Sequence, residues 1–151
     1  NLTPVLYSDL LKTKKFWNEI RGENILIFQT DSCLCNSKIN NFLKYDYVGA
    51  PWKYGWSYGG SVGNGGLSFR KKNKMLEIID KCKSNKIEDV YFSFGCQGVN
   101  IQKPSFNEGK KFSVESEYYH KPFAVHAAWK YLEPWQLKKI SKNCKCIDKI
   151  N

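Results

Sequence analysis

One stretch of the sequence decides the fold: Asn24-Ile25-Leu26-Ile27-Phe28-Gln29-Thr30-Asp31. Its four apolar residues follow one another without alternation, and three of them are β-branched or aromatic. This pattern predicts a strand over residues 24–29 that is buried on both faces. Because ligands of open α/β sheets bind beyond the carboxyl ends of the strands, we expect Asp31 to hold a cation or a substrate hydroxyl.

A βαβ unit is predicted to follow this strand. Residues 37–43 place apolar side chains on one helical face, with Asn36 or Ser37 as the cap, and residues 45–50 form the next apolar run. Strand, helix and strand in this order indicate a parallel pair with a right-handed crossover. The remaining predicted elements are two short helices over 5–21, helices over 71–84, from Glu88 and from Pro134, and strands over 67–70, 111–115 and 120–126.

Length and composition indicate a single domain over residues 1–151. The chain is 42% hydrophobic and 15% aromatic, which is enough to fill one core and excludes a disordered chain. It contains no run of about 18 or more apolar residues, so we expect no membrane span.

The charge of the chain indicates anionic partners in general. The formal net charge is +10, and it comes almost wholly from lysine because Arg21 and Arg70 are the two arginines of the sequence. The guanidinium groups that read base edges or clamp phosphates are therefore scarce, and the lysines are scattered. We expect no specific nucleic-acid partner.

The six cysteines include two C-x-C pairs, Cys33 with Cys35 and Cys144 with Cys146. Two such pairs could supply a tetrahedral zinc site, but the usual spacing between ligands is longer and no histidine lies near them in the sequence. Free thiols are the expectation. The alternative is that the pair near the C-terminus forms disulfides in an oxidising compartment.

Two loops have more than one interpretation. Residues 52–64 mix aromatic residues with glycine, which is typical of a lid that stacks on a sugar or a base, and equally of a surface loop held by its own aromatic side chains. Gly65 and Gly66 enter a short strand. They permit either a close backbone approach to a ligand or a tight turn.

Three titratable residues stand at places where elements begin or end. Glu88 and Asp89 precede an apolar run, so one of them is expected to cap a helix and the other to serve as a general base whose pKa the helix end lowers. His126 closes an apolar run as Asp31 does. It is either a metal ligand or phosphate donor at the same sheet edge, or a structural histidine.

Six motifs in order along the chain resemble an uncharacterised family of GT-A-type glycosyltransferase-like domains. They are Phe28-Gln29-Thr30-Asp31, Tyr45-Asp46-Tyr47-Val48-Gly49-Ala50-Pro51-Trp52, Gly63-Asn64-Gly65-Gly66-Leu67-Ser68 with Arg70, Glu88-Asp89-Val90-Tyr91-Phe92, Phe112-Ser113-Val114-Glu115, and Pro122-Phe123 with His126 and Trp129. The lysine-rich composition is similar to that of members from large DNA viruses or other AT-rich genomes. The resemblance implies a partial, Rossmann-like α/β fold of GT-A type, with a mixed, mostly parallel sheet flanked by helices. It also implies that the chain lacks the N-terminal nucleotide-binding half.

The same resemblance implies a set of site residues. Asp31 and His126 match the metal-binding positions, and Gln29 stands where the first aspartate of a D-x-D motif would be. Asp89 matches the base of the E-D-V-Y motif, with Glu88 beside it as the second catalytic carboxylate. The residues matching donor-binding or acceptor-binding positions are Gln29, Trp52, Asn64, Gly65, Gly66, Arg70 and Trp129, with Gly65 and Gly66 near the donor sugar and Trp52 on the acceptor side.

The activity implied is a metal-dependent glycosyl transfer. The cofactor would be Mn²⁺ or Mg²⁺, the donor a nucleotide sugar, foremost a UDP-sugar, and the acceptor a hydroxyl group of a glycan or protein. With Asp89 as the base, the transfer would invert the anomeric configuration. The alternative is a non-catalytic or degenerate carbohydrate-binding domain, since one carboxylate of the D-x-D motif and the N-terminal half are missing.

Overall fold

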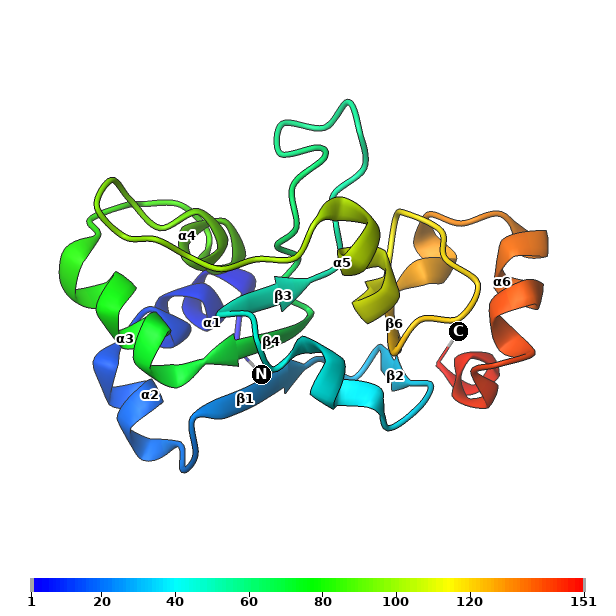
Figure 1. The fold of residues 1–151 in the computed structure, drawn as a ribbon, viewed down its shortest axis with the longest axis horizontal. Helices are drawn as coiled ribbons and strands as arrows, with labels where there is room; N and C mark the ends of the chain where they lie inside the picture. The colour runs from blue at the N-terminus through cyan, green and yellow to red at the C-terminus, as the bar shows by residue number, and fades with distance from the viewer. Residues whose placement is uncertain (1, 151) are drawn as a thin grey trace.

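Two small three-stranded sheets organise the chain, which a computed structural model describes over residues 2–150 (Figure 1). The strands are β1 (Asn24–Phe28), β2 (Ser32–Leu34), β3 (Tyr47–Gly49), β4 (Leu67–Lys71), β5 (Ser113–Val114) and β6 (Ala124–His126). The first sheet has the strand order β1-β4-β3, and the second has the order β2-β6-β5.

Helices accompany both sheets. The α-helices are α1 (Pro4–Leu11), α2 (Lys14–Glu19), α3 (Lys72–Lys81), α4 (Glu88–Phe94), α5 (Phe106–Phe112) and α6 (Pro134–Ser141), and the short 3₁₀ helices are η1 (Lys38–Phe42), η2 (Ala128–Lys130) and η3 (Lys145–Lys149). In Figure 1, α1 to α4 gather beside the first sheet, whereas α6 and η3 lie beside the second. The predicted α/β class is confirmed. Within residues 2–150, no helix is both long and apolar enough to cross a bilayer.

β4 is the centre of the first sheet and is buried along most of its length. Leu67 and Phe69 are 0% and 1% exposed, and antiparallel ladders join β4 to β1 on one side and to β3 on the other. The predicted parallel pair of β1 and β3 is wrong, because β4 inserts between them. β1 is consequently an edge strand, and Phe28 at its end is 65% exposed, so the predicted burial on both faces is also wrong.

Antiparallel pairing dominates both sheets, so the mostly parallel sheet expected from the sequence is wrong. In the second sheet β2 and β6 are antiparallel, and β5 with β6 is the one parallel pair among the described residues. The reason lies in the connections. The chain returns from β3 to β4 through a loop over residues 50–66, which Figure 1 shows projecting away from the sheets. A loop without a crossover helix joins antiparallel strands.

The other predicted elements are largely confirmed, with two local differences. The helix predicted over 37–43 is the 3₁₀ helix η1, with Ser37 at the N-cap position. The side-chain hydrogen bond comes from the residue before it, Asn36, whose Oδ1 accepts a 2.9 Å hydrogen bond from the backbone N–H of Lys38. The strand predicted over 111–115 is reduced to β5, because the capped helix α5 continues through Phe112, directly before the first residue of β5.

Aromatic packing fixes α4 against the first sheet. Trp17 is fully buried, its indole N–H donates a 2.7 Å hydrogen bond to the carbonyl of Leu11, and its ring meets that of Phe92 edge to face at 5.7 Å. Phe92 belongs to α4 and Trp17 to α2, so the N-terminal helices hold α4 in place. This packing sets the position of the two carboxylates at the start of α4.

All six cysteines form disulfides, so the expected free thiols are wrong. The bonds are Cys33–Cys146, Cys35–Cys144 and Cys82–Cys96. The first two join the segment at β2 to the segment at η3, and the third joins the end of α3 to the residues after α4. Cysteine spacing alone does not give connectivity, because the partners are brought together by the packing of the second sheet and α6.

We expect the Cys82–Cys96 bond to stabilise the fold measurably. It closes a loop with a sequence separation of 14, for which the chain-entropy model gives about 3 kcal/mol. The Cys82→Ser, Cys96→Ser and double variants should each lose about this much in chemical denaturation without reductant, because any one of them breaks the bond. Additive losses, with the double variant about twice as destabilised as each single one, would contradict the cross-link.

Candidate functional site

A cavity of about 960 Å³ opens beyond the end of β1. Its walls come from α1, the end of β1, the segment before β4, the start of α4 and the end of β6. The predicted site residues that line it are Gln29, Asp31, Asn64, Gly65, Gly66, Glu88, Asp89 and His126. Residues from four separate parts of the chain therefore share one hollow.

Three predicted site residues do not line this cavity: Trp52, Arg70 and Trp129. Trp52 is 7% exposed and stacks on Phe94 with ring centroids 6.2 Å apart. Arg70 is fully buried behind Glu88. Trp129 lies in η2, next to Lys130, whose ammonium group is 5.8 Å from the indole centroid. None of the three touches the hollow directly.

His126 is the best-connected side chain of the cavity. Its Nδ1 lies 3.1 Å from Glu115 Oε1, and its Nε2 lies 3.3 Å from Asp31 Oδ1 and 3.2 Å from Gln29 Oε1. Because the Glu115 carboxylate only accepts hydrogen bonds, it holds the proton of a neutral imidazole on Nδ1. The lone pair of Nε2 then faces two oxygen atoms, an arrangement that a cation between them stabilises.

The donor set at this point fits a divalent cation. Ligand atoms on adjacent octahedral positions, with bonds of about 2.1 Å, lie about 3 Å apart. The distances of 3.3 Å and 3.2 Å from His126 Nε2 to Asp31 and Gln29 are close to this value. A small divalent ion typically takes one or two carboxylates from the protein and completes its shell with water and phosphate oxygens. Lys130 Nζ, 3.4 Å from Asp31 Oδ2, would compete with such an ion.

Glu115 also fixes the glycine segment that lines the cavity beside His126. Its Oε2 accepts a 2.6 Å hydrogen bond from the Asn64 amide, and Asn64 Oδ1 accepts one of 3.0 Å from the backbone N–H of Gly66. Glu115 is only 5% exposed. One buried carboxylate therefore orients both the imidazole and the glycine segment.

Gly65 and Gly66 are required because other side chains lie against their backbone. A Cβ at Gly66 would lie 2.1 Å from the His126 ring, and one at Gly65 would lie 2.2 Å from Glu88 Oε1. Neither glycine has a positive φ, so the reason is space rather than backbone conformation. The space that each Cβ would need is thus filled by the protein's own side chains, and a close approach of a ligand stays a prediction.

Glu88 and Asp89 have different environments. Arg70 Nη1 donates a 2.6 Å hydrogen bond to Glu88 Oε2 inside the core, whereas Asp89 Oδ1 accepts one of 2.7 Å from the backbone N–H of Val90. Asp89 is thus the carboxylate that binds the start of the helix. The expected lowering of its pKa is wrong, because burial and the neighbouring Glu88 carboxylate raise the pKa of Asp89 to about 6 and outweigh that hydrogen bond.

Sequence reasoning missed the roles of Glu115, Ser8 and Lys130. Glu115 follows the short apolar strand β5, the same signal that pointed to Asp31 and His126. Ser8 Oγ accepts a 3.0 Å hydrogen bond from the backbone N–H of Glu88, a contact across 80 residues that local sequence does not indicate. Lys130 pairs with Asp31. Among 24 basic residues, nothing in the sequence distinguishes it.

The contact between Gly66 and His126 predicts a specific coupling. Gly66→Ala should destabilise the fold by about 1–3 kcal/mol, the usual cost of overpacking, because the new methyl group meets the imidazole. In the His126→Ala background the same substitution should cost much less. Chemical denaturation of the two single variants and the double variant measures the coupling, and additive losses would contradict the packing described.

The raised pKa of Asp89 predicts that its charge costs stability. Its pKa in the fold, about 6, lies above the ordinary value of 3.8, so the ionised form disfavours the folded state above pH 6, and the cost vanishes at a pH below the ordinary value. Asp89→Asn should therefore raise the melting temperature at neutral pH and leave it unchanged near pH 3. Asp148→Asn, at an exposed carboxylate, is the control. A lower melting temperature for Asp89→Asn at neutral pH would contradict this assignment.

Comparison with known proteins gives one match. The model of a family described as "Protein of unknown function (DUF5672)" matches residues 4–126. The matched range contains Asp31, Asp89 and Glu115 and ends at His126. No curated protein and no solved structure matches the chain. Since the match covers more than half of its length, the chain belongs to the DUF5672 family.

Proposed function

We propose that this chain is a metal-dependent glycosyltransferase domain that moves a sugar from a nucleotide-diphosphate donor, foremost a UDP-sugar, to a hydroxyl acceptor with inversion. We also propose that its two sheets form part of a GT-A-like fold. The proposal starts from the resemblance of its motifs to GT-A-type domains, with a lysine-rich composition similar to that of members from large DNA viruses or other AT-rich genomes.

One observation carries the proposal: Asp31, His126 and Asp89 line a single cavity although they are far apart in the sequence. The first two supply donor atoms 3.3 Å apart, and the third is a partly buried carboxylate. A cation site and a base in one hollow are the two requirements of this transfer.

Asp31 and His126 would hold Mn²⁺ or Mg²⁺, with Gln29 Oε1 as a third donor. The ion, when bound, supplies positive charge that stabilises a leaving diphosphate. Glu115 keeps the His126 ring in the orientation that leaves Nε2 free toward the cavity. The Lys130 ammonium, which pairs with Asp31, would add a second positive charge beside the ion.

Asp89 would act as the general base. In the transfer, the acceptor oxygen forms a bond to the anomeric carbon, the bond from that carbon to the diphosphate oxygen breaks, and the acceptor proton passes to Asp89. With a pKa of about 6, Asp89 is mostly ionised at neutral pH and still basic enough to take the proton, which suits a base at that pH. Glu88 acts on it indirectly, as a buried charge held by Arg70.

The remaining predicted residues would shape donor and acceptor binding. Gly65, Gly66 and Asn64 line the cavity beside His126, where a donor sugar would lie. Trp52 and Trp129 lie outside it, so we assign them to support of the neighbouring loops rather than to direct contact.

A second candidate, a degenerate carbohydrate-binding domain, is favoured by one observation. Lys130 Nζ lies 3.4 Å from Asp31 Oδ2, and Gln29 supplies an amide where a second carboxylate would strengthen cation binding. If Lys130 occupied Asp31 permanently, no metal ion would bind there. The cavity would then bind sugars without transferring them.

Thermal unfolding with Mn²⁺, with UDP and with both tests the proposal. We expect stabilisation that requires both, of about 2.7 kcal/mol at ligand concentrations near 100 times the dissociation constant. Asp31→Asn should abolish it. Asp89→Asn should keep it and lose turnover of the UDP-sugar, whereas Lys130→Ala should not weaken Mn²⁺ binding.

The outcomes separate the two candidates. If the chain binds glycans but its melting temperature does not change with Mn²⁺ and UDP, the degenerate domain is supported. If Mn²⁺ and UDP stabilise wild type and Asp31→Asn equally, the assignment of Asp31 as a metal ligand is contradicted. In the active chain, kcat/KM should rise with pH through about 6 as Asp89 ionises.

A further inference from the structure

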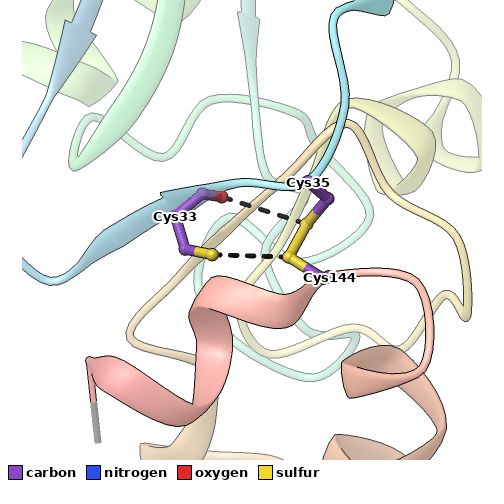
Figure 2. A group of neighbouring side chains, drawn as sticks. All are labelled: Cys33, Cys35 and Cys144. Atoms are coloured by element: carbon purple, nitrogen blue, oxygen red, sulfur yellow. Dashed lines mark hydrogen bonds between the residues drawn. A yellow bond between two sulfur atoms is a disulfide. The ribbon is translucent and has the colours of Figure 1, made fainter.

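The sulfur atoms of three cysteines lie close together outside the candidate site, and the sulfur atom of a fourth, Cys146, is bonded to one of them. Cys33 and Cys35 come from the segment at β2, and Cys144 and Cys146 from the segment at η3. Across the two disulfides, Cys33 Sγ lies 3.4 Å from Cys144 Sγ, and Cys144 Sγ lies 3.9 Å from Cys146 Sγ. Figure 2 shows Cys33 directly beside the Cys35–Cys144 bond.

These distances are close to those of a tetrahedral metal site. In a zinc centre with four thiolates and bonds of about 2.3 Å, neighbouring sulfur atoms lie about 3.8 Å apart. Among residues 2–150, Cys33, Cys35 and Cys144 are the one group of three or more histidine, cysteine or acidic side chains whose ligand atoms lie within 4.8 Å of one another. Cys146 lies outside this group, so the site requires its sulfur atom to move toward that of Cys35 once the two bonds are broken.

The backbone places the four side chains well for this purpose. Cys33 and Cys35 are two residues apart on extended chain, where alternate side chains point to the same face. Cys33 and Cys144 are 4% and 0% exposed, in an apolar cluster that includes Val125 and Ile140. Cys35 and Cys146 are partly buried. Four sulfur ligands are typical of structural zinc, whereas Mg²⁺ prefers oxygen ligands.

We infer that the reduced chain binds one Zn²⁺ through Cys33, Cys35, Cys144 and Cys146, so that a metal replaces two disulfides as the link between β2 and the C-terminal segment. This site is separate from the proposed transfer activity and does not depend on it. Its ligands Cys144 and Cys146 lie beyond residues 4–126, the range that the family shares.

The conversion balances in electrons and protons. A dithiol reductant gives two electrons and two protons to each disulfide and is itself oxidised to a disulfide, so two equivalents yield four cysteine thiols. Zn²⁺ then binds four thiolates, and four protons are released. The disulfides belong to an oxidising environment and the zinc centre to a reducing one.

Either form of the link holds β2 in place near the cavity. β2 begins directly after Asp31, and Ser32 lies opposite His126 in the ladder between β2 and β6. A chain with neither link would lose the constraint on this end of β2. The zinc centre would thus link β2 to the C-terminal segment in a compartment where disulfides do not persist.

Co²⁺ titration of the reduced full chain tests the inference. The protein is reduced with a phosphine, freed of excess reagent without air, and titrated with Co²⁺. We expect one equivalent to bind, with the thiolate-to-metal and visible absorption of a tetrahedral four-sulfur centre, and Zn²⁺ to displace it. Zn²⁺ should also raise the melting temperature of the reduced chain, whereas the oxidised chain should take up neither ion at the cysteines.

Two paired variants make the result decisive. The Cys82→Ser, Cys96→Ser double variant should retain the stoichiometry and the spectrum, because the third cysteine pair is not a ligand. The Cys144→Ser, Cys146→Ser double variant should lose both. Absence of thiolate absorption in the reduced wild type, or its persistence without Cys144 and Cys146, would overturn the inference. A reduced chain that is unfolded without metal and refolds with Zn²⁺, judged by far-UV circular dichroism, would support it.

Discussion

The hydrogen bond between Glu115 and His126 is the interaction on which the site depends. Both side chains are buried, at 5% and 7% exposure, and their polar atoms lie 3.1 Å apart. The carboxylate fixes the imidazole from one side while the backbone of Gly66 leaves room for it on the other. Because Glu115 also holds Asn64, the ring and the glycine segment keep one relative position. The Nε2 atom of His126 therefore points toward Asp31 and Gln29.

A second buried ion pair serves the other side of the cavity. Arg70 and Glu88 meet at 2.6 Å, and the arginine is fully buried with its Nη2 unpaired among the described residues. Removing either partner would leave a buried charge, which is costly, so the pair has to be kept together. Its effect reaches Asp89, because the Glu88 charge adds to burial in raising the pKa of that carboxyl. The same two side chains thus contribute to stability and, after burial, to the electrostatics of the proposed base.

Local sequence predicted most helices, strands over 24–29 and 120–126 that the structure shortens to β1 and β6, and eight of the residues that line the cavity. What it could not predict is pairing. Nothing in Ile25-Leu26-Ile27-Phe28 indicates that β4 lies next to it, because strand order is a property of long-range packing. We therefore predicted a strand inside the sheet from this apolar run, although it forms the edge strand β1. The same limit applies to the cysteines and to the contact of Ser8 with Glu88, which join segments far apart in the chain.

The central claim, that His126 and Asp31 form a cation site in the shared cavity, is tested most directly by Mn²⁺ titration followed by NMR. The paramagnetic ion broadens the resonances of nuclei near it. The account predicts that the His126 ring signals and the backbone amides of Gln29 and Asp31 broaden first, followed by that of Gly66. Broadening centred on other acidic residues, such as Glu77 and Asp80 of α3, with the His126 ring unaffected, would contradict it.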